Sequence, residues 1–261
     1  MFFSFELSTG KISLRKTVFR SIIYNMAYRK APFVEGEFYH IYSRGNSKQK
    51  IFLDNYDYDR FIKLLYLCNS ENSIDFREDI VRQGINAWDF DRGESIVSIG
   101  AWVLMLNHFH LYLTINPRKT GFRKFHKLSD NEITEFMHKL LTSYSKYFNT
   151  KYKRTGGLFE NRFKSVHIEN DNQAKYLFSY IHLNPVKLID SKWKENGIKN
   201  KKEAENFLKK YQWSSYLDFK GIIRSQNKIL NKKAFPKYFQ NIKDFDSEIE
   251  EWLTFSDFDL N

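Results

Sequence analysis

Two histidines, His108 and His110, lie within the apolar stretch WVLMLNHFHLYLTI at residues 102–115. Side chains alternate along a strand, so residues two apart point to the same face, about 7 Å from each other. Two imidazoles at that spacing can bind one metal ion, although such an ion needs a third protein ligand. The alternative is a pair of core residues with satisfied hydrogen bonds, which the pair taken alone favours.

A second pair with chemical potential lies in YLFSYIHLNPVK, residues 176–187. Tyr180 and Asn184 are four residues apart, so on a helix they share one face. A phenol oxygen can attack phosphorus, and an amide oxygen can complete the ligand set of Mg²⁺ or Mn²⁺. The alternative is that Tyr180 packs in the core and Asn184 caps the helix before Pro185, and spacing alone favours it.

Strands and helices must bring these two pairs together. Residues 36–46 alternate and end in Gly-Asn, which predicts a strand and a turn. Asp54 predicts the start of one helix, Ser129 with Glu132 predicts a capping box for another, and Pro185 ends a third. In chain order, the predicted strands and helices cover 36–46, 56–70, 95–106, 108–115, 132–152, a returning strand within 153–168, and 172–184.

That order predicts an α+β fold, in which helices pack on one face of an antiparallel sheet and the other face is free for a ligand. We expect an N-terminal extension at 1–30 and one domain at 31–220, with a polar, glycine-interrupted insertion at about 70–94. Residues 221–261 are expected to form a helical C-terminal extension with an acidic tail.

The composition is basic and aromatic. The 261 residues carry a formal charge of +11 and include 25 Phe and 16 Tyr. Residues 241–261 hold seven acids and one lysine, a net charge of −6, so residues 1–240 carry +17. This balance indicates a polyanionic partner such as nucleic acid, or alternatively a lysine-rich solubilising surface.

The single cysteine, Cys68, excludes an internal disulfide and a cysteine-rich zinc site. No apolar run reaches the length needed to span a membrane. We therefore expect a cytoplasmic protein without a membrane partner.

The segment LNHFHLYL resembles the His-hydrophobic-His motif of the HUH single-strand endonucleases, and its neighbours narrow the likeness to REP-associated tyrosine transposases. Six motifs occur in the family's order over about residues 33–220. They are FYHIYSRGN (38–46), IFLDNYDYDRF (51–61), NHFH (107–110), YFNTKYKRTGGLFENRFKS (147–165), YLFSYIHLNPVKL (176–188) and WSSY (213–216). The chain departs from the pattern at Phe159, where the family often has Trp.

The resemblance implies a ferredoxin-like (RRM-like) HUH core and a divalent metal, Mg²⁺ or Mn²⁺, bound by His108, His110 and Asn184. It places the nucleophile at Tyr180, in the family's Y-I-x-x-N-P-V segment. The implied activity is metal-assisted transesterification of single-stranded or hairpin DNA through a 5′-phosphotyrosine intermediate, by a monomer or a homodimer.

Basic residues in two loops are candidates for phosphate contacts, interleaved with phenylalanines on which bases could stack. Arg44, in the SRGN turn, is a further candidate. The loop residues are Arg118, Lys119, Arg123, Lys124 and Lys127 in the first loop, and Lys153, Arg154, Arg162 and Lys164 in the second.

Two other functions stay open. A domesticated protein could bind hairpin DNA without catalysis, although it would then retain the histidines, Tyr180 and Asn184 to no purpose. A zinc hydrolase would need further ligands, for which His40 and His182 are the histidines to examine.

Overall fold

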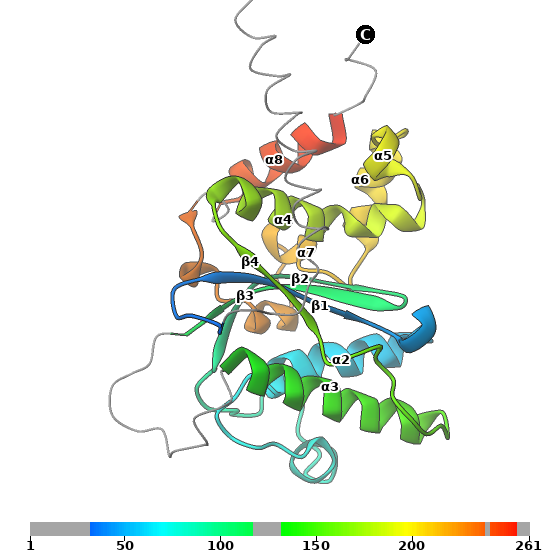
Figure 1. Cartoon of the computed structure of the whole chain (residues 1–261), viewed down its shortest axis with the longest axis vertical. Helices are drawn as coiled ribbons and strands as arrows, with labels where there is room; N and C mark the ends of the chain where they lie inside the picture. Colours follow the sequence, from blue (N-terminus) through cyan, green and yellow to red (C-terminus); the bar gives the residue numbers. More distant parts are fainter. Residues whose placement is uncertain (1–31, 117–131, 238–240, 255–261) are drawn as a thin grey trace, which may run out of the picture.

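The computed structural model describes residues 32–116, 132–237 and 241–254. Four antiparallel strands form one sheet in the order β2-β3-β1-β4 (Figure 1). Three of the strands were predicted at 36–46, 95–106 and 108–115, and the returning strand within 153–168 is also present. Their bounds are β1 Phe38–Arg44, β2 Val97–Met105, β3 His108–Ile115 and β4 Lys164–Ile168.

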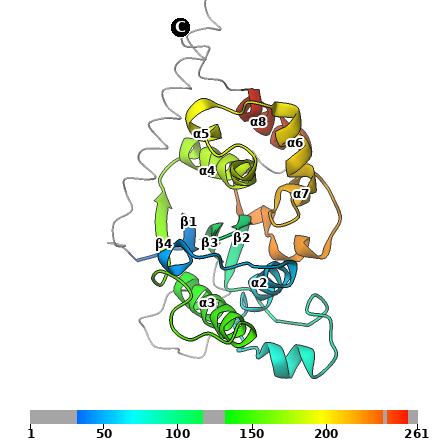
Figure 2. The same cartoon turned by 90° about the vertical axis from the view of Figure 1, so that its right-hand side faces the viewer.

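The α+β class is confirmed, because helices pack on an antiparallel sheet. The expectation that they pack on one face is wrong, because helices cover both faces. The helices α2 (Asn55–Leu67) and α3 (Glu132–Lys151) lie on one side, and α4 (Asp171–Leu183) lies on the other (Figure 2). The physical reason lies in β2 and β3. Every residue of β2 is buried, and all of β3 except partly exposed His108, which is typical of strands buried on both faces.

A bulge in β2 keeps its large side chains on the correct faces. The pairing with β3 shifts between Ile99 and Ala101, so odd-numbered residues before the bulge and even-numbered residues after it face α2 and α3. A Cβ at Gly100 would lie 2.7 Å from the ring of Phe235. Only glycine therefore allows this ring to cover the bulge.

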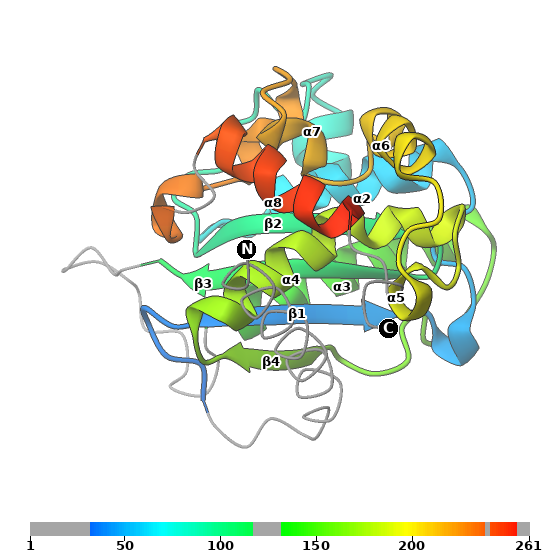
Figure 3. The ribbon, with the colours of Figure 1, turned by 90° about the horizontal axis from the view of Figure 1, so that it is seen from above.

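Four further helices of the C-terminal third pack on the α4 side. They are α5 (Trp193–Asn196), α6 (Lys201–Lys210), α7 (Tyr216–Phe219) and α8 (Ile242–Thr254), which Figure 3 shows beside and above α4. Short 3-10 segments lie at Asn46–Lys48, Asn184–Leu188, Ser225–Ile229 and Lys232–Ala234.

Residues beyond 220 belong to the same cores as the rest of the domain. Ile229 lies in the core under α2 and α3, whereas Phe235 and Phe245 lie in the core under α4. The predicted insertion at 70–94 contains a π-helix, Phe76–Val81, and a small apolar cluster of its own. The proposed division of the chain at these positions stays a prediction.

Some sequence expectations fall outside the described residues. They are the N-terminal extension, the capping role of Ser129, and the first basic loop with Arg118, Lys119, Arg123, Lys124 and Lys127. Across the ranges that the structure describes, no helix combines the length and apolarity needed to cross a membrane.

A buried carboxylate, Asp57, joins α2 to α3. It is fully buried, and it accepts hydrogen bonds from the Lys151 ammonium at 2.7 Å and from the Tyr147 and Tyr152 hydroxyls at 3.0 and 2.7 Å. It also accepts from the Leu53 amide at 2.8 Å and from the Asp54 amide at 3.4 Å, and the second of these bonds completes the capping box at the start of α2.

Replacing Asp57 with alanine should destabilise the fold by about 3 kcal/mol, because it leaves a lysine and two hydroxyls without their common acceptor. The matched control is Asp59→Ala, which breaks only an exposed pair with Lys63 on the same helix and should cost below about 0.5 kcal/mol. Urea unfolding of both variants measures the difference, and equal costs would show that Asp57 does not hold the two helices together.

Candidate active site

The pairing of β1 with β3 determines which side chains meet on the α4 face. Tyr42 lies opposite His110 and Arg44 lies opposite His108. The two histidines of β3 share this face, with ring centroids 5.1 Å apart, and Phe109 between them packs into the opposite core. His40 of β1 lies on the same face, with its ring centroid 5.0 Å from that of His110.

Helix α4 places Tyr180 directly beside these rings. The phenol ring meets the His110 ring edge to face, with centroids 5.3 Å apart and planes at 76°. The Tyr176 ring stacks on Tyr180 with centroids 6.2 Å apart, and the Lys194 Nζ lies 4.0 Å from the Tyr180 ring centroid. The predicted nucleophile therefore adjoins His110, one of the two predicted metal-binding histidines.

Asn184 occupies the C-cap position of α4, where the chain continues into a 3-10 turn. Its side chain is 1% exposed, yet neither Oδ1 nor Nδ2 has a hydrogen-bond partner among the described residues. The amide lies close enough to the Tyr180 hydroxyl to lower the pKa of that phenol. Because a buried amide without partners is costly, this side chain is a candidate ligand and not a satisfied cap.

The candidate donor atoms are of types that divalent cations bind. The His110 Nε2 is buried and has no partner among the described residues, like the Asn184 amide. The His108 Nδ1 lies 2.7 Å from the Asn107 Oδ1, which leaves its Nε2 available as a ligand nitrogen. Two imidazoles and an amide oxygen suit Mn²⁺ or Mg²⁺ with positions left for phosphate oxygens.

Burial keeps the imidazoles neutral. It lowers the pKa of His40 to about 3 and that of His108 to about 4, and it holds the pKa of His110 well below 6.5. Lys194 adds to all three shifts, and Lys187 adds to those of the two β3 histidines. Neutral rings at physiological pH keep the lone pairs that a metal needs.

The same burial makes the phenol a weaker acid. It raises the pKa of Tyr180 to about 12, against the opposing effects of Asn184 and Lys187. Burial also lowers the pKa of Lys194 to about 8. Two lysines thus place positive charge beside the site, where an entering phosphate would neutralise it.

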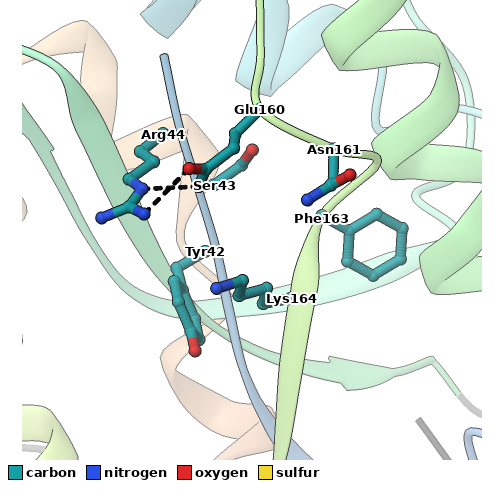
Figure 4. Close-up of a pocket in the computed structure, with 7 residues that line it drawn as sticks. All are labelled: Tyr42, Ser43, Arg44, Glu160, Asn161, Phe163 and Lys164. Carbon is teal, nitrogen blue, oxygen red and sulfur yellow. Dashed lines mark hydrogen bonds and ion pairs between the residues drawn. The ribbon is translucent and has the colours of Figure 1, made fainter. Parts of the chain in front are cut away.

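Arg44, predicted to contact phosphate, forms a bidentate ion pair with Glu160 at 2.5 and 2.9 Å. The pair lines a cavity of about 60 Å³ beside the site (Figure 4), together with Lys164 of the second basic loop. Arg162, two residues before Lys164, is exposed. Lys153 and Arg154 follow the end of α3, where the Arg154 guanidinium bonds to the Asn149 side chain at 3.1 Å.

Three site residues were not assigned roles in the site from the sequence. From the sequence, His40 is only a possible zinc ligand, and Tyr42 and Lys194 have no expected role. Because side chains alternate along β1, His40 and Tyr42 point to the same face of the sheet. Only the pairing of β1 with β3 shows that His110 points to this face too.

His182, the other histidine considered as a zinc ligand, has both ring nitrogens bonded, to the Phe178 carbonyl and the Ser215 hydroxyl at 2.8 Å each. Among the described residues, no group of three or more His, Cys, Asp or Glu side chains is arranged to hold a metal ion. The ligand set of a zinc hydrolase is therefore not found in this part of the chain.

Comparisons with known proteins give little beyond the chain's own residues. No family model matches the chain, and no curated protein matches it. A solved structure of a REP-associated tyrosine transposase bound to a REP hairpin is similar over 77% of this chain and 90% of that one, with 14% identity and a TM-score of 0.43.

The buried histidines predict a loss of stability in acid. His40, His110 and His182 are at most 7% exposed, and their pKa values are lowered in the folded state. Below about pH 6.5 these histidines are protonated in the unfolded chain but stay neutral in the folded protein. The free energy of unfolding therefore falls by up to about 1.4 kcal/mol for each ring with every pH unit of acidification. The stabilisation is fully present above that pH and is lost progressively toward the folded pKa values.

Urea titrations at pH 7.0 and 5.0 measure this effect, and the stability should be markedly lower at pH 5.0. The slope should decrease in a His182→Phe variant, which removes one of the three rings. A free energy of unfolding that is the same at both pH values would contradict the neutral state of these histidines.

Proposed function

We propose that the protein cleaves and rejoins single-stranded DNA by transesterification, with Tyr180 as the nucleophile. One observation carries the proposal: a tyrosine, two neutral imidazoles and an unpartnered buried amide converge on one face of the sheet, beside two lysines. The order of the six sequence motifs agrees with this arrangement. Mg²⁺ or Mn²⁺ would be held by His108, His110 and Asn184.

In the proposed reaction the Tyr180 oxygen attacks the scissile phosphorus. The bond from phosphorus to the 3′ oxygen breaks, which gives a 5′-phosphotyrosine link and a DNA strand ending in a 3′-hydroxyl. The phenol proton leaves to solvent, and the departing oxygen takes up a proton. Attack by another 3′-hydroxyl reverses the step, so DNA is rejoined without a nucleotide cofactor because the phosphoester bond is conserved.

The bound cation would supply charge neutralisation at the phosphate oxygens. The chain's own residues orient the reactants. The phenol ring contacts both the His110 ring and the Tyr176 ring, which restricts the rotation of Tyr180 before attack. Lys187 and Lys194 attract the phosphate and offset the charge of the phenolate, whose formation burial opposes.

Covalent capture tests the nucleophile. Wild-type protein incubated with a labelled single-stranded hairpin and Mn²⁺ should form an SDS-resistant adduct, and Tyr180→Phe should abolish it. The matched control is Tyr176→Phe, one helical turn away in the same ring stack, which should retain the adduct. An adduct that survives Tyr180→Phe would disprove the assignment. Absence of any adduct from wild type with varied hairpins would instead favour a silent DNA-binding protein.

Asn184 offers a test that separates a ligand from a structural residue. Asn184→Leu should leave the free energy of unfolding unchanged or higher, because it removes a buried amide without partners, while Mn²⁺ affinity should fall on the order of tenfold or more. Free Mn²⁺ counted by EPR, together with urea unfolding, measures both effects.

The control is Asn69→Leu. The Asn69 side chain is also buried, but its amide donates to the Val97 carbonyl at 2.9 Å and accepts from two backbone amides. This variant should lose stability and keep its Mn²⁺ affinity. If Asn184→Leu behaved in the same way, Asn184 would be structural and the proposed ligand set would be wrong.

A further inference from the structure

His40 lies against the His110 ring, at the edge that carries Nδ1. It is 4% exposed, and its Nε2 lies 2.8 Å from the His110 Nδ1. The rings of His40 and Tyr42 stack with centroids 4.8 Å apart, which fixes the plane of the His40 ring. The remaining nitrogen of each histidine, Nδ1 of His40 and Nε2 of His110, has no partner among the described residues.

A neutral imidazole carries one N–H and one lone pair, so the 2.8 Å contact requires one proton between the two rings. There are two arrangements. Either His110 donates from Nδ1 to His40, or His40 donates from Nε2 to His110. Within the protein alone the two are balanced, because each leaves one buried donor and one buried acceptor without a partner.

A cation distinguishes the two arrangements. A metal ion needs a lone pair on the His110 Nε2, so the proton must be on Nδ1 and must be donated to His40. His108 shows the same pattern, since its Nδ1 lies 2.7 Å from the Asn107 side-chain oxygen. Each histidine of the proposed ligand pair thus has an acceptor behind it, on the nitrogen that does not face the ligand position.

We propose that His40 is a positioning residue, which accepts the Nδ1 proton of His110 and so presents the His110 Nε2 lone pair to the cation. The inference rests on the proposed function, since it concerns the same metal site. His40 is not itself a ligand in this arrangement, because its Nε2 accepts the hydrogen bond from His110 and its Nδ1 carries the ring proton.

The rival explanation is that His40 only fills space between β1 and α4. Two substitutions separate the explanations. His40→Phe keeps a stacked ring but removes the acceptor, whereas His40→Gln can place a carbonyl oxygen near the position of the lost Nε2. A space-filling role predicts that Phe substitutes better than Gln, and an acceptor role predicts the reverse.

The experiment measures Mn²⁺ affinity by EPR for the full-length chain and its variants, with thermal unfolding of each. His40→Phe should bind Mn²⁺ about tenfold or more weakly, and His40→Gln should stay within about threefold of wild type. The control is His182→Phe, which removes a fully buried histidine bonded away from the site and should bind Mn²⁺ like wild type.

Wild-type affinity in His40→Phe, or equal losses in the Phe and Gln variants, would overturn the role of His40 and leave the proposed function intact. Failure of the wild type to bind Mn²⁺ would overturn the metal site itself. If His40→Phe does not fold, long-range ¹H–¹⁵N NMR of Mg²⁺-loaded wild type decides the question. A proton on the His110 Nδ1 supports the proposal, and a proton on its Nε2 overturns it.

Discussion

The antiparallel register between β1 and β3 is the constraint on which the site depends. It sets Tyr42 opposite His110 and Arg44 opposite His108, and so brings His40 against His110. A slip of one residue would turn the β1 side chains to the other face. The burial of both faces resists such a slip, because it would move Ile41 out of the core under α2 and α3.

Burial on the α4 face then determines the chemistry. It keeps three histidines neutral, it raises the pKa of Tyr180, and it leaves polar atoms of His110 and Asn184 without partners among the described residues. A protein interior normally satisfies such atoms, so their concentration at one place indicates a ligand. The cost of keeping them unpaired is offset by the two large apolar cores on either side of the sheet.

Much of this arrangement could be predicted from the sequence because it depends on local periodicity. The strand period places His108 and His110 on one face of a strand, and the helix period places Tyr180 and Asn184 on one face of a helix. The sequence could not show how these faces meet, since strand register and helix docking depend on contacts between distant segments. The role of His40 and the nearness of Lys194 to Tyr180 depend on those contacts.

The fold was predicted less completely for a related reason. The unbroken apolar run of β2 predicts a strand, whereas its lack of alternation indicates burial on both faces, against the expected packing of helices on one face. The Arg44 guanidinium is held by Glu160, a partner 116 residues away, and its contact with phosphate stays a prediction. Pairings of this kind follow from tertiary packing and leave no local signal.

The central claim is that Tyr180 becomes covalently joined to DNA. Peptide mapping by mass spectrometry, after reaction with a hairpin and Mn²⁺ and digestion with trypsin and nuclease, tests it most directly. The account predicts a nucleotide phosphate on the 176–187 peptide, with fragment ions that assign it to Tyr180. The same mass located on Tyr176, or on a tyrosine of any other peptide, would contradict the account.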